Sequence, residues 1–521
     1  MNSEKLPDPT SPAQEAGLGE IGSVHVVQED RLTRSLSARQ VQMIAIGGTI
    51  GTGLFLGTGK ALAQAGPASV LITYSIIGAN VFVTMLSLGE MAAFIPVAGS
   101  FCTFAGRFVD DAFGFALTWN YWFNDAITFA ADLVALQIVL EYWANNFPGW
   151  AFSLIFWVVI IGLNVVAVKI EYWLCLLKVI TIIVFIILGI AVNCGANVDG
   201  RYIGGENWHL PGAPFVNGIG GFASVFVTAA FAYGGTESIA ITAGETKSPA
   251  KTIPKVVQNV FWRILFFYVL SVLIIRLNVP YNYPELGSKT VKTSPFTLVF
   301  QMTGAKAAGS VMNAVIMTSV ISAGNHALFA GARLMFALAN AGHAPKVFGK
   351  LNRQNVPWIA VIITGLVSGL CFGSSKIGAG QLWTWLQNLV GVSNQLNWLA
   401  IGITSIRFRA ALQRQNKTHL LPFRNYTYPL GPWVCVIGNA IIVLVQGWQC
   451  FSPTFNAVDF VSFYIEIPIM FIMYIIWKIV KKTHLVKLED MDLETDRWSS
   501  DAEDESPSKR TRVKQILNWI Y

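Results

Sequence analysis

The residues of this chain whose types and spacing suit chemistry are ionisable side chains inside segments that are apolar enough to cross a bilayer. Asp125 and Asp132 lie in one such segment, Lys178 lies in a second and Glu237 in a third. A charge at the middle of a bilayer costs at least about 2.5–3.5 kcal/mol, so each of these residues calls for an explanation. A buried carboxylate can bind a cation, and a buried lysine can exchange a proton near neutral pH.

Each of these residues also has a purely structural interpretation. Asp125 and Asp132 are nearly two helical turns apart with Thr128 between them, so all three share roughly one helix face. They form either a negatively charged pocket for a side chain or a buried polar ladder that ties neighbouring helices together. Lys178 is either a proton-exchanging group or a fixed counter-ion for one of the acids. Glu237 is either a functional group or a hydrogen-bond partner for irregular backbone.

Two of the apolar segments carry glycines near their middle. The first contains Gly-Gly-Thr-Ile-Gly-Thr-Gly-Leu-Phe over residues 47–55, and the other contains Phe-Ala-Tyr-Gly-Gly-Thr-Glu over residues 231–237. Each Gly in a helix costs roughly 0.5–1 kcal/mol relative to Ala, and non-helical backbone in a membrane must be buried in protein or line a cavity. Either these helices are broken, or their small residues let neighbouring helices pack closely.

Broken helices would provide backbone groups for a ligand. Free N–H groups near Thr52 and Gly53 would suit a carboxylate, because the start of a helix carries a positive dipole end. Free C=O groups near Thr49 and Phe231 would suit an ammonium group. Glycine-interrupted segments at matching positions in the two halves of a membrane protein indicate a transporter binding site. A backbone site for an anion beside a backbone site for a cation therefore predicts a receptor for the zwitterion of an α-amino acid.

The elements that hold these residues must be membrane-spanning helices. The chain has 521 residues, of which 54% are hydrophobic and 12% charged, whereas a soluble domain carries about 25% charged residues. Apolar runs of about 20 residues recur, which predicts an all-α polytopic membrane protein embedded in a lipid bilayer. We expect about 12 transmembrane helices, at roughly 41–65, 68–95, 113–143, 152–168, 172–193, 217–243, 258–280, 305–338, 358–374, 383–406, 431–450 and 459–480.

Charge and cysteine usage exclude other classes of protein. The net charge is +7, but the Lys and Arg residues cluster between spans, which indicates topology rather than nucleic-acid binding. We expect both termini in the cytosol, with a disordered tail over 1–40, a transmembrane domain over 41–482 and a second tail over 483–521, where regulatory partners could bind. The six cysteines show no metal pattern. We expect no metal, cofactor or enzymatic activity.

Several longer motifs carry a family resemblance. Besides residues 47–55, they are Leu-Gly-Glu-Met-Ala-Ala-Phe-Ile-Pro-Val-Ala-Gly-Ser-Phe over 88–101, Gly-Thr-Glu-Ser-Ile-Ala-Ile-Thr-Ala-Gly-Glu over 235–245 and Val-Phe-Trp-Arg-Ile-Leu-Phe-Phe-Tyr-Val over 260–269. From about residue 35 to about residue 495 the chain resembles the fungal amino-acid permeases of the amino acid–polyamine–organocation superfamily. The resemblance implies a leucine-transporter-like 5+5 inverted repeat with broken helices 1 and 6 plus two extra helices, proton-coupled uptake and a plasma-membrane location.

Within that family the third span, over 126–135, is similar to that of the lysine and basic amino-acid permeases. The resemblance implies that Thr128 and Asp132 shape the site for the substrate side chain, and that Lys178, Glu237 and Glu245 take part in proton coupling. The residues expected to contact the substrate are Thr49, Gly51, Thr52, Gly53, Thr128, Asp132, Phe231, Ala232, Gly234 and Glu237.

Three departures from the family pattern leave the specificity open. The connection over 168–173 is short, Val390 replaces a small hydroxyl residue, and Arg276, which we expect to extend toward the membrane surface, replaces a small residue. The favoured function is proton-coupled symport of cationic amino acids such as lysine and arginine. A broad-range or neutral permease, or an amino-acid sensor that does not transport, is the alternative.

Overall fold

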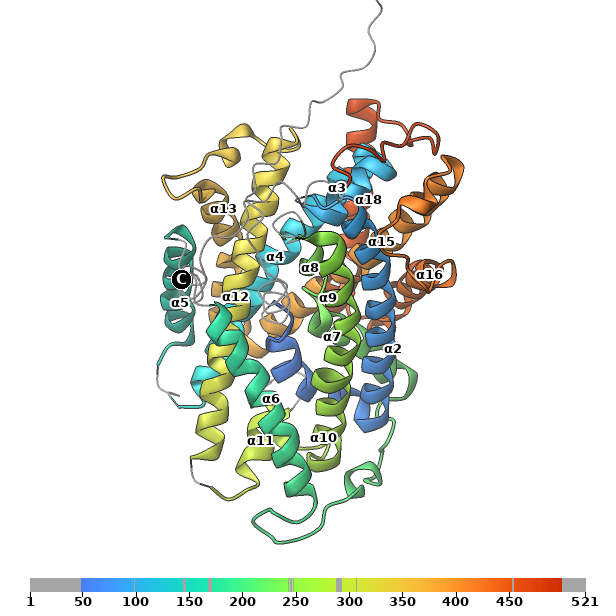
Figure 1. Ribbon diagram of the computed structural model, residues 1–521. Coiled ribbons are helices and arrows are strands. Elements are labelled where there is room, and N and C mark those ends of the chain that lie inside the picture. The colour runs from blue at the N-terminus through green and yellow to red at the C-terminus, as the bar shows by residue number, and fades with distance from the viewer. Residues whose placement is uncertain are drawn as a thin grey trace, which may run out of the picture. The chain divides into compact units, whose positions relative to one another are not determined.

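The structure, a computed structural model, describes residues 48–97, 99–143, 147–166, 171–241, 243, 246, 248–286, 293–305, 307–451 and 454–498. These residues form helices and connecting segments, and no strand occurs among them (Figure 1). The α-helices are α2 (Thr58–Phe94), α3 (Ser100–Phe108), α4 (Asp111–Glu141), α5 (Gly149–Val165), α6 (Glu171–Asn193), α7 (Gly218–Tyr233), α8 (Ser238–Ile241), α9 (Pro249–Arg263), α10 (Ser271–Asn278), α11 (Pro295–Gln301), α12 (Ala308–Asn340), α13 (Trp358–Ser368), α14 (Ser374–Ile377), α15 (Ala379–Arg414), α16 (Leu430–Val445), α17 (Ala457–Tyr464) and α18 (Glu466–Lys481).

Shorter helical turns complete the chain. Two are π-helical, at Gly53–Gly57 and Ile264–Leu270. The others are 3₁₀ turns, at Glu206–Trp208, Pro284–Leu286, Lys346–Gly349, Gly369–Gly373, Thr418–Leu420 and Trp448–Cys450.

The described helices agree with the expected spans. Eight helical stretches are long and apolar enough to cross a membrane, and α17 with α18 forms a further span bent by 46°. Helix α5, with 17 residues, is slightly shorter, and α15, with 36 residues, carries many polar residues. Helix α5 ends at Val165 and α6 begins at Glu171, so the short connection noted in the sequence falls mostly on residues 167–170, outside the described residues.

The first two spans meet at a glycine. The stretch Gly53–Phe94 has 42 residues, and at 1.5 Å per residue it is about twice as long as the hydrocarbon core is thick. At Gly66 the backbone has φ +80°, and a Cβ there would lie 2.7 Å from the carbonyl oxygen of Pro214. Pro67 follows directly. Gly66 therefore separates the end of the first span from the start of the second.

Helix α4 lies at the centre of the helical packing. It packs against both α12 and α15 (Figure 1), and 83% of its apolar stretch is buried. In α6, and in the stretch Trp358–Ile377 that begins with α13, only 39% of the apolar window is buried, as expected for helices with one face toward lipid. Asp125 and Asp132 on α4 are consequently enclosed by protein.

The chain after α18 packs against the ends of several helices. We call residues 484–498 the C-terminal strap. The Arg107 side chain forms an ion pair of 3.0 Å with Asp492, and the Trp498 backbone N–H donates to the Phe94 carbonyl at 3.0 Å. Gln415, just after α15, donates to the Met491 carbonyl at 2.8 Å. The strap thereby connects the end of α2 and the helix α3 to the end of α15.

Candidate functional site

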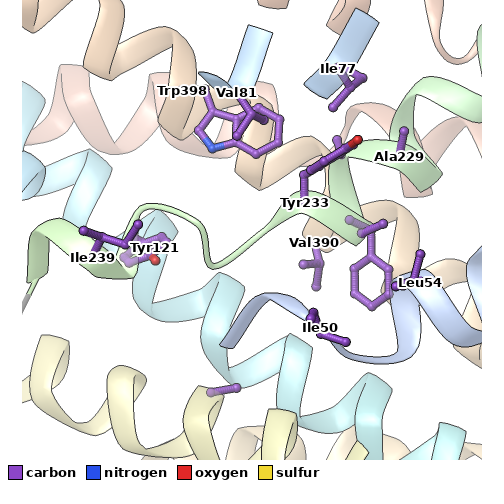
Figure 2. Close-up of a cluster of buried hydrophobic side chains, with 14 of the residues drawn as sticks. Ile50, Leu54, Ile77, Val81, Tyr121, Ala229, Tyr233, Ile239, Val390 and Trp398 are labelled. Carbon is purple, nitrogen blue, oxygen red and sulfur yellow. The ribbon is translucent and has the colours of Figure 1, made fainter. Parts of the chain in front are cut away.

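Both glycine-rich spans are broken, as one of the two interpretations of the sequence predicts. Helix α7 ends at Tyr233, Gly234 is extended with φ −56° and ψ 152°, and Gly235 has φ +80° before α8 begins at Ser238. Figure 2 shows this non-helical stretch between Tyr233 and Ile239, and a second one beside Ile50 and Leu54.

The two breaks cross in direct contact. A Cβ on Gly53 would lie 2.5 Å from the Cα of Ala232, and one on Gly235 would lie 2.9 Å from the carbonyl oxygen of Gly48. These distances are too short for real Cβ atoms, so only glycine allows this approach of backbone to backbone. The glycines predicted to break the spans therefore also fit the two breaks together.

The carbonyl groups expected to be free each accept one hydrogen bond. The Tyr268 hydroxyl donates to the Thr49 carbonyl at 2.8 Å, and the Gly234 N–H donates to the Phe231 carbonyl at 3.2 Å. A carbonyl oxygen has two lone pairs, so the Phe231 carbonyl can accept a second hydrogen bond.

A small cavity lies at the crossing, with a volume of about 50 Å³. Eight of the ten predicted contact residues line it, namely Thr49, Gly51, Thr52, Gly53, Thr128, Asp132, Phe231 and Gly234. The other lining residues are Gly48, Asn124, Asp125, Gly235, Ser238, Ala323, His326, Ala327, Val390 and Asn394. Segments far apart in sequence, from the two breaks, α4, α8, α12 and α15, therefore surround one space.

Two carboxylates line this cavity from α4. The Thr52 hydroxyl donates to Asp132 Oδ1 at 2.8 Å. Among the described residues, neither Asp132 Oδ2 nor Asp125 Oδ2 has a hydrogen-bond partner, and both atoms are buried. Such unpaired oxygens are rare in protein interiors, which makes them the chemically distinctive feature of the cavity.

Other predicted residues lie elsewhere. Ala232 and Glu237 are not among the lining residues. Glu237 accepts hydrogen bonds from the Gly235 N–H at 3.4 Å and from the Trp398 indole at 3.3 Å. It therefore stabilises the backbone of the second break without lining the cavity. Lys178 is buried and interacts electrostatically with Asp132, but it does not line the cavity either. Glu245 lies outside the described residues.

Residues of α15 complete the cavity, and our selection of sites from sequence does not include them. The Asn124 amide donates to Asn394 Oδ1 at 2.8 Å, and the Asn394 amide donates to the Ala230 carbonyl at 3.1 Å. This chain of amides connects α4 to α15 and to the end of α7. The polar run Asn-Gln-Leu-Asn over 394–397, inside a predicted membrane span, is the signal that indicates it.

One expectation about a buried charge is wrong. Arg276 does not extend to the membrane surface but is fully buried, with 0% of the residue exposed. Its Nη1 donates to the Thr58 carbonyl at 3.1 Å. The guanidinium therefore ties α10 to the start of α2, directly after the first break.

Comparisons with known proteins agree with this architecture. The family model for amino acid permeases matches residues 40–490. A probable amino-acid permease of Schizosaccharomyces pombe is 48% identical over 92% of this chain and 98% of its own length. The lysine-specific permease LysP of Escherichia coli is 44% identical, over 88% of this chain and 96% of its own length. The general amino-acid permease GAP2 of Candida albicans is 39% identical, over 90% of this chain and 82% of its own length. The chain therefore belongs to the amino acid permease family, whose members are multi-pass membrane transporters rather than enzymes.

Proposed function

We propose that this permease is a proton-coupled symporter of cationic amino acids, and that the cavity between the two breaks holds its substrate. The observation that carries the proposal is the carboxylate of Asp132, buried in the cavity wall with its Oδ2 unpartnered. A buried charged oxygen that lacks a hydrogen bond costs at least about 1–3 kcal/mol. A cationic substrate side chain would remove that cost by binding there.

The two ends of the substrate fit different parts of the wall. The α-carboxylate takes the N–H groups at the start of the π-helical turn Gly53–Gly57, where the helix dipole is positive. The α-ammonium donates hydrogen bonds to the carbonyls at the ends of the two broken helices, near Thr49 and Phe231. Thr128 and Asp132 then contact the side chain, and the nearby charge of Asp125 strengthens the preference for a cation.

Substrate binding requires the site to expand. A volume of about 50 Å³ accommodates a few water molecules, since a cavity needs roughly 10–15 Å³ to hold one. An amino acid needs several times that space. The lining segments of α4, α12 and α15 must therefore move away from the two breaks when substrate enters, as alternating access requires.

Proton coupling is assigned to the buried ionisable groups beside the cavity. Lys178 interacts electrostatically with Asp132, so its protonation would respond to a cation bound at that carboxylate. Glu237 contacts the second break directly, and Glu245 is the further acid expected to act with these two. We place the protein in the plasma membrane, with residues 1–40, 483–521 and both termini in the cytosol.

The test of substrate class is the substitution Asp132→Asn, which preserves shape and removes charge. Breaking a buried ion pair costs roughly 3–5 kcal/mol, so lysine uptake should fall at least about a hundredfold. Leucine uptake should fall much less, because a neutral side chain does not use the carboxylate. The measurement is the ratio of labelled lysine to labelled leucine uptake, at matched surface abundance.

Glu489→Gln is the matched control, since it removes one carboxylate from an exposed ion pair with Arg414. It should leave the ratio unchanged. An equal loss of both substrates in Asp132→Asn would show that Asp132 only positions α4, and the proposal of cationic specificity would fail. A broad-range permease would then be favoured by Val390, an apolar residue in the cavity wall, together with the similarity to the general permease of Candida albicans. If the unsubstituted protein does not accumulate labelled amino acid at all, it is instead a sensor.

A further inference from the structure

A second and larger hollow lies on the outer face of one helix, away from the substrate cavity. It has a volume of about 310 Å³ and is lined by Val256, Asn259, Val260, Trp262, Arg263, Phe266 and Phe267. These residues recur at three- and four-residue intervals on α9 and the π-helical turn that follows it, so they form one continuous helix face. We call this hollow the α9 groove.

A buried guanidinium with an unused donor lines the α9 groove. Arg263 is only 8% exposed, and among the described residues its Nη2 has no hydrogen-bond partner. Tyr268 and Glu237 influence Arg263 electrostatically, but no described carboxylate forms an ion pair with it. A guanidinium offers five N–H donors in a planar fork that matches carboxylates and phosphates. Arg263 is therefore suited to an anion that enters through the groove.

Arg263 lies near the start of the expected span 258–280, so its long side chain can extend toward the lipid headgroups. Trp262 beside it is 56% exposed, and tryptophan is enriched where a span meets the headgroups. Two turns earlier on α9, Lys255 is exposed and adds positive charge. Beyond Arg263 the groove is lined by the apolar rings of Phe266 and Phe267. Basic pockets between transmembrane helices, near the cytoplasmic surface, bind the headgroups of anionic lipids.

We propose that the α9 groove is a binding site for an anionic phospholipid. The lipid phosphate lies against the guanidinium of Arg263, for which the described residues provide no ion-pair partner. The acyl chains lie over Phe266 and Phe267, and the indole of Trp262 packs beside the glycerol. The site is separate from the substrate cavity, because none of its lining residues is shared between the two.

The experiment uses the full-length protein in phosphatidylcholine liposomes that contain a trace of photo-crosslinking phosphatidylglycerol or photo-crosslinking phosphatidylcholine. Crosslinks are mapped by mass spectrometry. Phosphatidylglycerol should label residues 256–267 at least about fivefold more than phosphatidylcholine, which corresponds to about 1 kcal/mol. Arg263→Gln should bring this ratio close to one, whereas Arg263→Lys should retain most of the preference.

Two further variants keep the test decisive. Arg353→Gln removes one exposed positive charge from a different loop and should leave the ratio unchanged. Asn259→Trp fills the groove from its exposed rim and should reduce labelling by both lipids, even if Arg263→Gln does not fold. Equal labelling of the unsubstituted protein by the two lipids, or an unchanged ratio in Arg263→Gln, would overturn the proposal. Absence of labelling by either lipid would mean that protein covers the groove, and would overturn it as well.

Discussion

A methyl group added at Gly53 should weaken substrate binding, because there is no space for it between the two breaks. In Gly53→Ala, the new Cβ would lie 2.5 Å from the Cα and 2.9 Å from the backbone nitrogen of Ala232. Non-bonded carbons require about 3.5–4.0 Å, so the two breaks must separate by about 1 Å. Both neighbouring atoms belong to backbone and cannot rotate away. Overpacking of this kind costs typically about 1–3 kcal/mol of stability, and the same free energy lost from the binding geometry corresponds to a loss of about 5- to 150-fold in the affinity for substrate.

The assay is labelled amino-acid uptake over a range of concentrations, with surface abundance measured in the same cells. Gly57→Ala is the matched control in the same helical turn. The nearest atom to its Cβ would be a side-chain carbon, Thr228 Cγ2, at 3.3 Å, and the nearest backbone atom, the Thr52 carbonyl oxygen, would lie at an ordinary contact distance of 4.0 Å. We expect Gly57→Ala to retain most of the uptake. Normal affinity in Gly53→Ala would refute the inference that the close crossing of the two breaks forms the binding site.

Two other predictions concern charged groups. Although partial burial opposes it, hydrogen bonds from Thr495 and Glu494 and the charge of Arg107 hold the pKa of Asp492 at about 2. Because this pKa is below the unfolded value of about 3.9, the stabilisation of the C-terminal strap is complete above about pH 4 and is lost as the pH falls toward 2. Hydrogen exchange over 486–498, corrected for intrinsic rates, should show this loss of protection, and an unchanged protection at pH 2 would contradict it. Lys178→Ala should uncouple accumulation from the pH gradient more than it weakens binding; accumulation that follows the gradient at full strength would make Lys178 a structural residue.

The breaks and the acidic wall of the cavity could be predicted because their signals are local. Glycine inside a span and a carboxylate inside a span are each costly in a bilayer, so their positions alone indicate Gly53, Gly234 and Asp132. The twelve expected spans could be predicted from hydrophobic runs, which are also a local signal. They include the span at 383–406, which lies within α15 although that helix carries many polar residues.

What could not be predicted depends on contacts between distant segments. Asn394 supports the second break only because α15 packs beside α4 and α7, and sequence spacing does not provide that contact. Arg276 remains buried because the Thr58 carbonyl faces it, although an arginine near the end of a span would ordinarily reach water. The sequence from Glu489 to Glu505 is rich in acidic residues, which gives no sign of docking, yet Met491 and Leu493 of the strap are buried.

The close fit of Gly53 against Ala232 has a thermodynamic consequence. Because the two breaks are locked against each other when the chain folds, the conformational entropy of ordering their backbone is lost at that stage and not again when a ligand arrives. A free amino acid has few atoms and offers little surface to compensate for disorder in its receptor. A rigid crossing therefore allows a very small molecule to be held by main-chain groups, while the adaptable side chains around it remain free to change the range of substrates.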